Sequence, residues 1–495
     1  MSDLSDLSDP SDLSDLSDLS DLSDLSDHSL LKVNYPMKEI RVLSPTAILG
    51  YGFPVESFEE GMKRHPDVIA VDAGSTDPGP YYLGAGISFT DRNSVKRDLD
   101  IMIPAAIKAG IPVIIGTGGG SGARPHVAIV RKIIEEIASA HGLSFKYAEI
   151  CSELDKELVR SYFKEGKITP LQPAPELEEK DIDEAVHIVA QIGEEPYIKA
   201  LEEGAQVILA GRSYDPSVFA ALPIKQGFPK GLAIHMGKIL ECAAIAALPG
   251  SGSDCMFGYL REDHYELETL SPLRKPTTLS IAAHTLYEKS NPYLLPGPGG
   301  RLNLHGTTFE QVAENRVRVA GTVFEPTDGY FVKLEGVRSV GFRTISCAAV
   351  ADPILISKID EVKEAVRARV DNNFKDYGLG DYFLDFKIYG RSGIMSMFPA
   401  YKAEPGNELL MIIEVVGKSQ EVADTICSFA RSTFLHYGYE GRMSTAGNLA
   451  FPFSPSDAHM GEVFEFNVYH LMKVDDPTSL FPITYRTFEK GTPKD

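Results

Sequence analysis

The stretch VIIGTGGGSGARPHVAIV, residues 113–130, decides the fold. It begins as an apolar run and continues into a loop with five glycines between positions 116 and 122. Pro125 then opens a segment whose apolar residues recur at helical spacing, and proline is favoured in the first turn of a helix. The pattern predicts a buried strand, a glycine-rich loop and a helix. Such a unit is typical of a parallel sheet covered by helices.

The same alternation of strand and helix extends to both sides of this unit. Apolar runs near residues 40, 69, 146 and 208 predict further strands, separated by segments with helical spacing. We therefore expect residues 37–270 to form an α/β domain, with a mostly parallel sheet and helices on both faces. Beyond residue 270 the chain is first rich in proline and glycine and then in β-type and helical segments. Residues 271–495 are expected to form a second, α+β domain.

Residues 1–36 differ in character from the rest of the chain. They repeat the acidic unit Ser-Asp-Leu, whose period of three matches neither a helix face nor a strand face. We expect this segment to be disordered, and to be an added tag or the result of a mis-assigned start. The folded chain is then expected to begin at Met37.

Composition excludes several classes of protein. The 495 residues are 43% hydrophobic and 24% charged, and no apolar run reaches the roughly 18 residues that cross a membrane. No secretory signal is recognisable. The formal charge of −22 argues against nucleic acid and anionic membranes as partners, because both bind basic patches. The five cysteines form no CxxC pair, so we expect free thiols and a cytoplasmic location rather than a zinc site or disulfides.

The glycine loop is the first candidate site, because ligands of open parallel sheets bind beyond the carboxyl ends of the strands. A helix follows the loop, and backbone N–H groups at a helix start favour an anion, so we expect the loop to bind a phosphate or carboxylate. Two alternatives stay open: a tight turn that needs small residues, and a dinucleotide site in which Glu149 binds the ribose. The loop consists of Gly118, Gly119, Gly120, Ser121 and Gly122.

A second polar loop, DAGSTDPGP, begins at the end of the apolar run that contains Asp72. Its two carboxylates, Asp72 and Asp77, can hold a divalent cation or divide the roles of acid and base. Ser75 and Thr76, which lie between them, are expected to contact the ligand. The alternative is that Ser75 and Asp77 only cap the backbone of a Pro-Gly-Pro turn.

A third loop, AGRSYDP, supplies Arg212 and Asp215 at the end of another strand. Arginine binds carboxylates and phosphates through two parallel hydrogen bonds, so Arg212 is expected to hold an anionic group. A structural Arg–Asp pair is the alternative. Downstream, His235 and Lys238 are three residues apart and share one helix face. His235 is expected to exchange a proton with the substrate, unless it is a buried core histidine.

Further candidates follow in the sequence. Glu241 and Cys242 continue the helix face of the histidine, and His284 and His305 lie in the loop-rich connection, where a lid can form. Arg97 is expected to cover the second polar loop. The histidines show no HExxH or H-x-H spacing and there is no G-x-S-x-G motif, which argues against a histidine metal site and against an α/β-hydrolase.

Four segments resemble the acyclic terpene utilisation (AtuA-like) family: RVLSPTAILGYGFP, VIAVDAGSTDPGPYYLGAG, IIGTGGGSG and ILAGRSYDPSVFAALPI. The resemblance covers roughly residues 38–470. It implies a cytoplasmic catabolic protein acting on small organic acids or acyl thioesters, in pathways such as citronellol and geraniol breakdown. It also implies a short companion protein, which we expect to be a separate partner. Family likeness identifies no catalytic residues, so the assignments rest on the residues themselves.

We therefore predict a lyase or hydratase acting on a small carboxylate or an acyl-CoA. The glycine loop and Arg212 would hold its anionic group, Asp72 or Asp77 would be general base or metal ligand, and His235 or Asp215 would be the proton partner. The candidate cofactors are a divalent cation and a CoA thioester substrate. The alternatives are a nicotinamide-dependent oxidoreductase and a non-catalytic subunit that activates the companion protein. A homo-oligomer is expected from size and metabolic setting.

Overall fold

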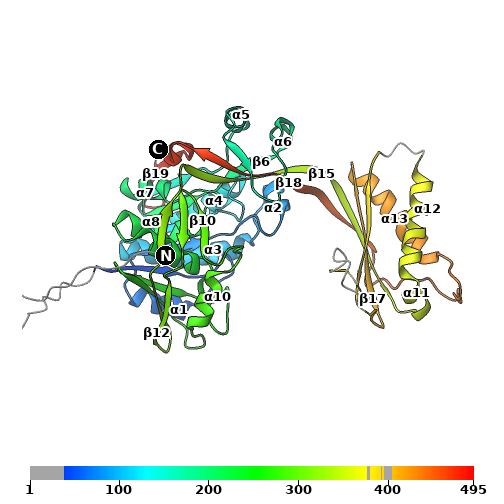
Figure 1. The fold of residues 1–495 in the computed structure, drawn as a ribbon, viewed down its shortest axis with the longest axis horizontal. Coiled ribbons are helices and arrows are strands. Elements are labelled where there is room, and N and C mark those ends of the chain that lie inside the picture. Colours follow the sequence, from blue (N-terminus) through cyan, green and yellow to red (C-terminus); the bar gives the residue numbers. More distant parts are fainter. Residues whose placement is uncertain (1–37, 376–379, 392, 395–403, 495) are drawn as a thin grey trace, which may run out of the picture. The chain divides into compact units, whose positions relative to one another are not determined.

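The computed structural model describes residues 38–375, 380–391, 393–394 and 404–494 (Figure 1). The acidic repeat predicted to be disordered lies outside the described residues. The described chain is a mixed α/β protein with an eleven-stranded sheet, a six-stranded sheet and a three-stranded sheet. Among these residues, no helix has the combination of length and apolarity that spanning a bilayer requires.

The centre of the large sheet is parallel, as the alternation of strand and helix predicts. Five strands lie side by side in parallel pairing. In sheet order they are β1 (Ile40–Ser44), β2 (Val68–Asp72), β3 (Val113–Gly116), β7 (Val207–Ala210) and β4 (Phe145–Ile150).

Helices cover both faces of this parallel centre. Alternate residues of one strand enter different cores: Val68 and Ala70 of β2 pack with one set of helices, and Ile69 and Val71 with the other. The second set consists of α1 (Val55–Lys63), α3 (Arg92–Ala109) and α4 (Arg124–His141). The first set includes α7 (Glu195–Glu202), α8 (Asp215–Lys225) and α9 (Lys230–Leu240).

The flanks of the large sheet are antiparallel, which the local pattern does not predict. On one side β1 pairs with β8 (Met256–Leu260), followed by β9 (His264–Thr269), β13 (Arg316–Ala320) and β12 (Thr308–Ala313). On the other side β4 pairs with β19 (Ile483–Glu489), which pairs with β20 (Thr492–Lys494). Hydrogen bonds between β9 and β13 therefore join residues on both sides of position 270.

The six-stranded sheet is built on two long strands, β15 (Tyr330–Val350) and β18 (Asp457–Val474). One half of β15 pairs with β17 (Leu409–Gly417), which in turn pairs with β16 (Phe383–Tyr389). Helices α12 (Ile359–Phe374) and α13 (Gln420–His436) share a hydrophobic core with these strands (Figure 1). The other half of β15 pairs with β6 (His187–Ala190) and carries Glu335.

Shorter elements complete the described chain. The three-stranded sheet has the order β10 (Leu294–Gly297), β11 (Gly300–Asn303) and β14 (Val323–Pro326). The others are α2 (Pro80–Ala85), α5 (Lys156–Lys164), β5 (Ile168–Pro170), α6 (Glu179–Glu184), the 3-10 helix η1 (Ala243–Ala246), α10 (Thr278–Thr285), α11 (Pro353–Ser357) and α14 (Pro477–Leu480).

The strand order creates a switch point between β3 and β7. These strands are neighbours, yet β3 continues into α4 on one face of the sheet and β7 into α8 on the other. The carboxyl edge at such a switch point is where open α/β sheets commonly bind ligands. The loops after β3 and β7 are the glycine loop and the AGRSYDP loop, and Asp72 ends the adjacent strand β2.

Candidate functional site

Asp72 is a buried carboxyl group at this carboxyl edge. Its Oδ2 accepts a hydrogen bond from the N–H of Gly74 at 3.2 Å, while its Oδ1 is buried and has no partner of ordinary geometry in the described residues. Burial raises the pKa of Asp72 well above its usual value, and the negative charge of Asp215 adds to the effect. The positive charge of Arg212 lowers the pKa of Asp72 and so opposes this rise. The net upward shift favours the protonated form of Asp72, which can donate a proton.

Lys238 and Glu241, near the end of α9, contribute a second buried carboxyl group. The ammonium of Lys238 lies 2.5 Å from Oε1 of Glu241, and Oε2 of Glu241 has no partner in the described residues. Burial raises the pKa of Glu241 to about 7; Lys238 opposes this rise and Asp215 adds to it. The charge of Glu241 also raises the pKa of Asp72, so the two carboxyl groups belong to one electrostatic cluster.

Arg212 lies at the same edge of the sheet, but its charge is neutralised by carboxylates of the protein. Its Nε donates to Oε2 of Glu335 at 2.7 Å, and its Nη1 donates to Oδ1 of Asp215 at 2.9 Å. Burial opposes the charge on Arg212, but the two carboxylates raise its pKa further above the usual value. The geometry matches the structural Arg–Asp pair that the sequence left open as the alternative to anion binding.

Glu335 is the centre of a buried network. Its Oε1 accepts hydrogen bonds from the hydroxyl of Thr76 at 2.9 Å and from the ammonium of Lys333 at 2.7 Å. Although burial opposes ionisation, Arg212 and Lys333 lower the pKa of Glu335 to about 2. Thr76, predicted to contact a ligand, thus contacts β15 instead. The network fixes the DAGSTDPGP and AGRSYDP loops to a strand of the other sheet.

Thr117 holds an unusual backbone conformation between β3 and the glycine loop. Its φ of 47° is rare for a β-branched residue, which makes this position strained. The N–H of Thr117 donates to the carbonyl of Gly211 at 3.0 Å, and its Oγ1 accepts from the N–H of Ser213 at 3.3 Å. The hydroxyls of Ser213 and Tyr197 are 2.5 Å apart. These contacts lock the two switch-point loops together.

The glycine loop itself is buried and tightly packed. A Cβ atom on Gly118 would lie 2.8 Å from Leu209 Cδ1, one on Gly120 would lie 2.8 Å from Phe89 Cβ, and one on Gly122 only 2.0 Å from the backbone nitrogen of Arg212. Gly119 would similarly meet His126. The need for small residues therefore comes from protein packing. Ser121 Oγ remains buried without a partner among the described residues.

The start of α4, beyond the glycine loop, already has an anion. The carboxylate of Glu153 accepts from the N–H of Arg124 at 2.7 Å and lies 2.8 Å from Nδ1 of His187. Glu149, which a dinucleotide site would use for the ribose, instead accepts hydrogen bonds from Arg131 at 2.9 Å and Tyr147 at 2.7 Å. Neither the pyrophosphate position nor the ribose position of a dinucleotide site is thus open in this structure.

The remaining part of the DAGSTDPGP loop forms a self-contained turn. The hydroxyl of Ser75 donates to Oδ2 of Asp77 at 2.8 Å and accepts from the N–H of Asp77 at 3.1 Å. Asp77 is exposed, whereas Asp72 is buried. The part of the chain that the structure describes contains no group of three or more histidine, cysteine, aspartate or glutamate side chains arranged to hold a metal ion.

His235 is surrounded by neutral side chains. Its Nδ1 lies 2.7 Å from the hydroxyl of Thr322 and its Nε2 lies 3.0 Å from the hydroxyl of Thr285, while Tyr265 packs edge-on against the ring. Burial lowers the pKa of His235 to about 3, and the charge of Lys238 adds to this. Both ring nitrogens are engaged, so we do not include His235 among the proposed acid–base groups.

The three remaining sequence candidates, His284, Cys242 and His305, differ in their surroundings. Burial lowers the pKa of His284 to about 4, and the positive charge of Lys238 adds to this effect. Nε2 of His284 has no hydrogen-bond partner in the described residues. Cys242 is half-buried and follows Glu241; desolvation, followed by the charge of Glu241, raises the pKa of its thiol above the usual range. His305 is exposed and stacks on Tyr293.

Glu241, Glu335 and Lys289 are the functional candidates to which sequence reasoning gave least weight or none. Glu241 had a detectable signal, since it is a carboxylate between the apolar runs of a buried helix and of η1. Glu335 and Lys289 had none, because neither lies in a motif. Burial is the main cause that lowers the pKa of Lys289, followed by the charge of Lys238.

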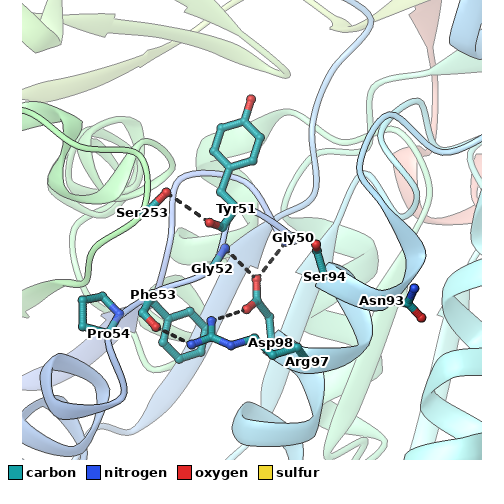
Figure 2. A pocket seen from close by; sticks show the side chains of 10 residues that line it. All are labelled: Gly50, Tyr51, Gly52, Phe53, Pro54, Asn93, Ser94, Arg97, Asp98 and Ser253. Carbon is teal, nitrogen blue, oxygen red and sulfur yellow. Dashed lines mark hydrogen bonds and ion pairs between the residues drawn. The ribbon is translucent and has the colours of Figure 1, made fainter.

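A cavity of about 540 Å³ lies beside the loop that follows β1 (Figure 2). Its floor is the buried carboxylate of Asp98, which accepts from the N–H groups of Gly50 at 2.9 Å and Gly52 at 3.1 Å and pairs with Arg97 at 2.7 Å. Arg97 thus covers this loop rather than the Asp72 loop. The cavity is not lined by the carboxyl cluster, but the N–H of the preceding Leu49 donates to the backbone carbonyl of Asp72.

Comparison with known proteins gives one match. The family model described as acyclic terpene utilisation family protein AtuA matches residues 91–247 and 276–450, which is more than half of the chain. Comparisons with curated proteins and with solved structures give no match. The matched ranges include the glycine loop, Arg212, Glu241 and Lys289. The likeness that the sequence motifs indicate is confirmed, and the chain belongs to the acyclic terpene utilisation (AtuA) family.

Proposed function

We propose that this protein is an acid–base enzyme of acyclic terpene utilisation, a lyase or hydratase that acts on a small carboxylate or its acyl-CoA. Family membership supports the pathway. The reaction class rests on one observation: Asp72 and Glu241 are buried carboxyl groups of one cluster, each with a raised pKa and an unpartnered oxygen. Carboxyl groups with raised pKa values are typical of proton-transfer sites.

The two groups are suited to opposite halves of a proton transfer. Glu241, with a pKa of about 7, is partly ionised at neutral pH and can remove a proton from the carbon next to a carbonyl or carboxyl group. The raised pKa of Asp72 favours its protonated form, and in that form Asp72 can give its proton to a departing hydroxyl group, which leaves as water. A C–H and a C–O bond break, a C=C bond forms, and hydration is the reverse. Asp72 ends as a carboxylate and Glu241 as an acid, and solvent restores both.

The surrounding residues position these two groups. The ion pairs of Arg212 with Glu335 and Asp215 fix the loop after β7, and Lys238 holds Glu241 by one oxygen while leaving the other unpartnered. All five cysteines are free thiols, which supports a location in the reducing cytoplasm. The nicotinamide-dependent alternative finds less support, because Glu153 and Glu149 are already bonded within the chain.

The test follows proton exchange, which NMR detects even when the final product has not been identified. Wild-type protein is incubated in D₂O with candidate unsaturated acids and their CoA thioesters, and NMR records loss of C–H signals or appearance of hydroxylated product. The expected result is exchange or hydration that falls by about 10² to 10⁴ in Asp72→Asn. A folded Asp72→Asn protein that turns the substrate over at the wild-type rate would overturn the proposal. Activity that needs the companion protein would favour the non-catalytic alternative.

A further inference from the structure

The cluster at the switch point gathers four basic side chains, Arg212, Lys238, Lys289 and Lys333. Its acidic side chains are Asp72, Asp215, Glu241 and Glu335, and ion pairs join three of the basic groups to them. A basic side chain without a carboxylate partner can have its charge balanced by an anionic ligand.

Three of the four cations already have a carboxylate partner. Arg212 pairs with Glu335 and Asp215, Lys238 with Glu241, and Lys333 with Glu335. Lys289 differs, because no hydrogen bond or ion pair to its ammonium occurs in the described residues, although the charges of Lys238, Glu241 and Asp215 all reach it. Lys289 is therefore the cation of this cluster that is left for a ligand.

The backbone around Lys289 is shaped to bring it to the cluster. Glu288 adopts a φ of 60°, a left-handed conformation that is strained for a residue with a side chain. On the preceding residue, the Tyr287 ring stacks on His284 with centroids 5.3 Å apart, and the ammonium of Lys238 lies 5.5 Å from the Tyr287 centroid. The turn thus lies against the helices that carry His284 and Lys238, and Lys289 is partly buried there.

Three residues of this cluster and its surroundings also carry a buried polar atom without a partner. Oδ1 of Asp72, Oε2 of Glu241 and Nε2 of His284 are all buried without a hydrogen-bond partner in the described residues. Buried polar groups are rarely left unpaired, so three in one cluster indicate that a polar molecule belongs there. A carboxylic acid in its neutral form can donate to such a molecule, as Asp72 is placed to do.

We infer that Lys289 binds a carboxylate group of the substrate, so that the substrate class is a free or carboxylate-bearing acid rather than a plain acyl thioester. The inference rests on the proposed function for the surrounding carboxyl groups. Lys289 takes the role of recognising the anion that the sequence assigned to Arg212, because the guanidinium of Arg212 is held by Glu335 and Asp215. The substrate's carboxylate would face Lys289 while the adjacent carbon faces Glu241.

The experiment compares binding of matched ligands to the full chain. Titration calorimetry measures a panel of short and branched mono- and dicarboxylates, the primary amide of each, and the CoA thioesters of the monocarboxylates. The variants are Lys289→Met and Lys289→Arg, with Lys225→Met, an exposed lysine at the end of α8, as the matched control. Melting temperatures confirm that each variant is folded.

The expected result is that Lys289→Met weakens binding of the acids at least tenfold, about 1.4 kcal/mol, without affecting the amides. Lys289→Arg should retain most of the affinity, and Lys225→Met should match the wild type. Equal affinity of wild type and Lys289→Met for the acids would overturn the inference, as would equal losses for acids and amides, or binding of the CoA thioesters alone. The proposed function fails separately, if acids bind but Asp72→Asn turns them over normally.

Discussion

Nε of Arg212, after β7, lies 2.7 Å from Oε2 of Glu335, in the N-terminal half of β15, and both side chains are almost completely buried. The two residues are 123 positions apart in sequence and belong to different sheets. The pair therefore ties the carboxyl edge of one sheet to the longest strand of the other. Removing one partner of a buried ion pair leaves an uncompensated charge, and this asymmetry makes the pair testable.

Glu335→Gln should destabilise the protein by about 3–5 kcal/mol, because Arg212 and Lys333 lose their common carboxylate. Urea unfolding at pH 7 measures the change. The contribution of Glu335 to the stability of the wild-type protein should also depend on pH. The pKa of Glu335 is about 2 in the folded protein against an ordinary 4.5, so its stabilisation is complete above pH 4.5 and is lost as pH falls toward 2. A variant as stable as wild type at pH 7 would contradict this prediction.

His235 should make the protein sensitive to mild acid. Its pKa is about 3 when folded against an ordinary 6.5, so the neutral ring stabilises the fold fully above pH 6.5 and progressively less below it. Between pH 6.5 and 5 the free energy of unfolding should fall by about 2 kcal/mol, at 1.4 kcal/mol per pH unit. Denaturant unfolding of wild type and His235→Gln at both pH values gives the difference. The same pH slope in both proteins would show that another group is responsible.

Glu241→Gln should remove one limb of the pH–rate profile. If Glu241 is the base, the wild-type rate rises as pH increases through about 7, because only the carboxylate accepts a proton. In the glutamine variant the rate should be lower by about 10² to 10⁴ and should not rise across this range. The comparison uses the deuterium exchange assay at fixed substrate. An unchanged profile in the variant would assign the base to another residue.

Gly122→Ala should be far more damaging than a matched substitution. Gly122 has a φ of 72° and a Cβ there would lie 2.0 Å from the backbone nitrogen of Arg212. Gly142, at the end of α4, has a φ of 61° and open space around it, so Gly142→Ala should cost only about 1 kcal/mol. Thermal melting compares the two variants. Similar losses would mean that backbone conformation, rather than packing, requires the glycine at 122.

Asp77→Ala distinguishes a turn residue from a metal ligand. The Asp77 carboxylate is exposed and is bonded to Ser75 within its own turn. We expect the variant to lose less than about 1 kcal/mol of stability and none of its exchange activity, with or without added Mg²⁺. Exchange rates measured across a Mg²⁺ titration provide the check. A rate that depends on Mg²⁺ in wild type and not in the variant would restore Asp77 as a ligand.

The parallel centre could be predicted because each of its strands is a short apolar run followed by a helical one. That information is local. The antiparallel flanks could not be predicted in this way, since β19 pairs with β4 across more than three hundred residues and nothing in either strand specifies its partner. Tertiary contacts decide such pairings.

The candidate site shows the same division. Asp72, Arg212 and Asp215 follow apolar strands, so topology alone brings them to one edge. Their states could not be predicted, because protonation of Asp72 depends on burial and on Glu241, and the partners of Arg212 depend on Glu335. Lys289 lies in an ordinary polar stretch and becomes a candidate only when its neighbours in space are known.

The hydrogen bonds between β9 and β13 bear on how this chain can be divided by genetic engineering. A shortened gene ending at residue 270 would encode a protein in which β9 is an open edge, ready to pair with other molecules, and in which Arg212 has lost Glu335. Such a product is expected to aggregate. Recombination between relatives should therefore exchange both sequence regions together, because neither supplies a finished edge to the sheet on its own.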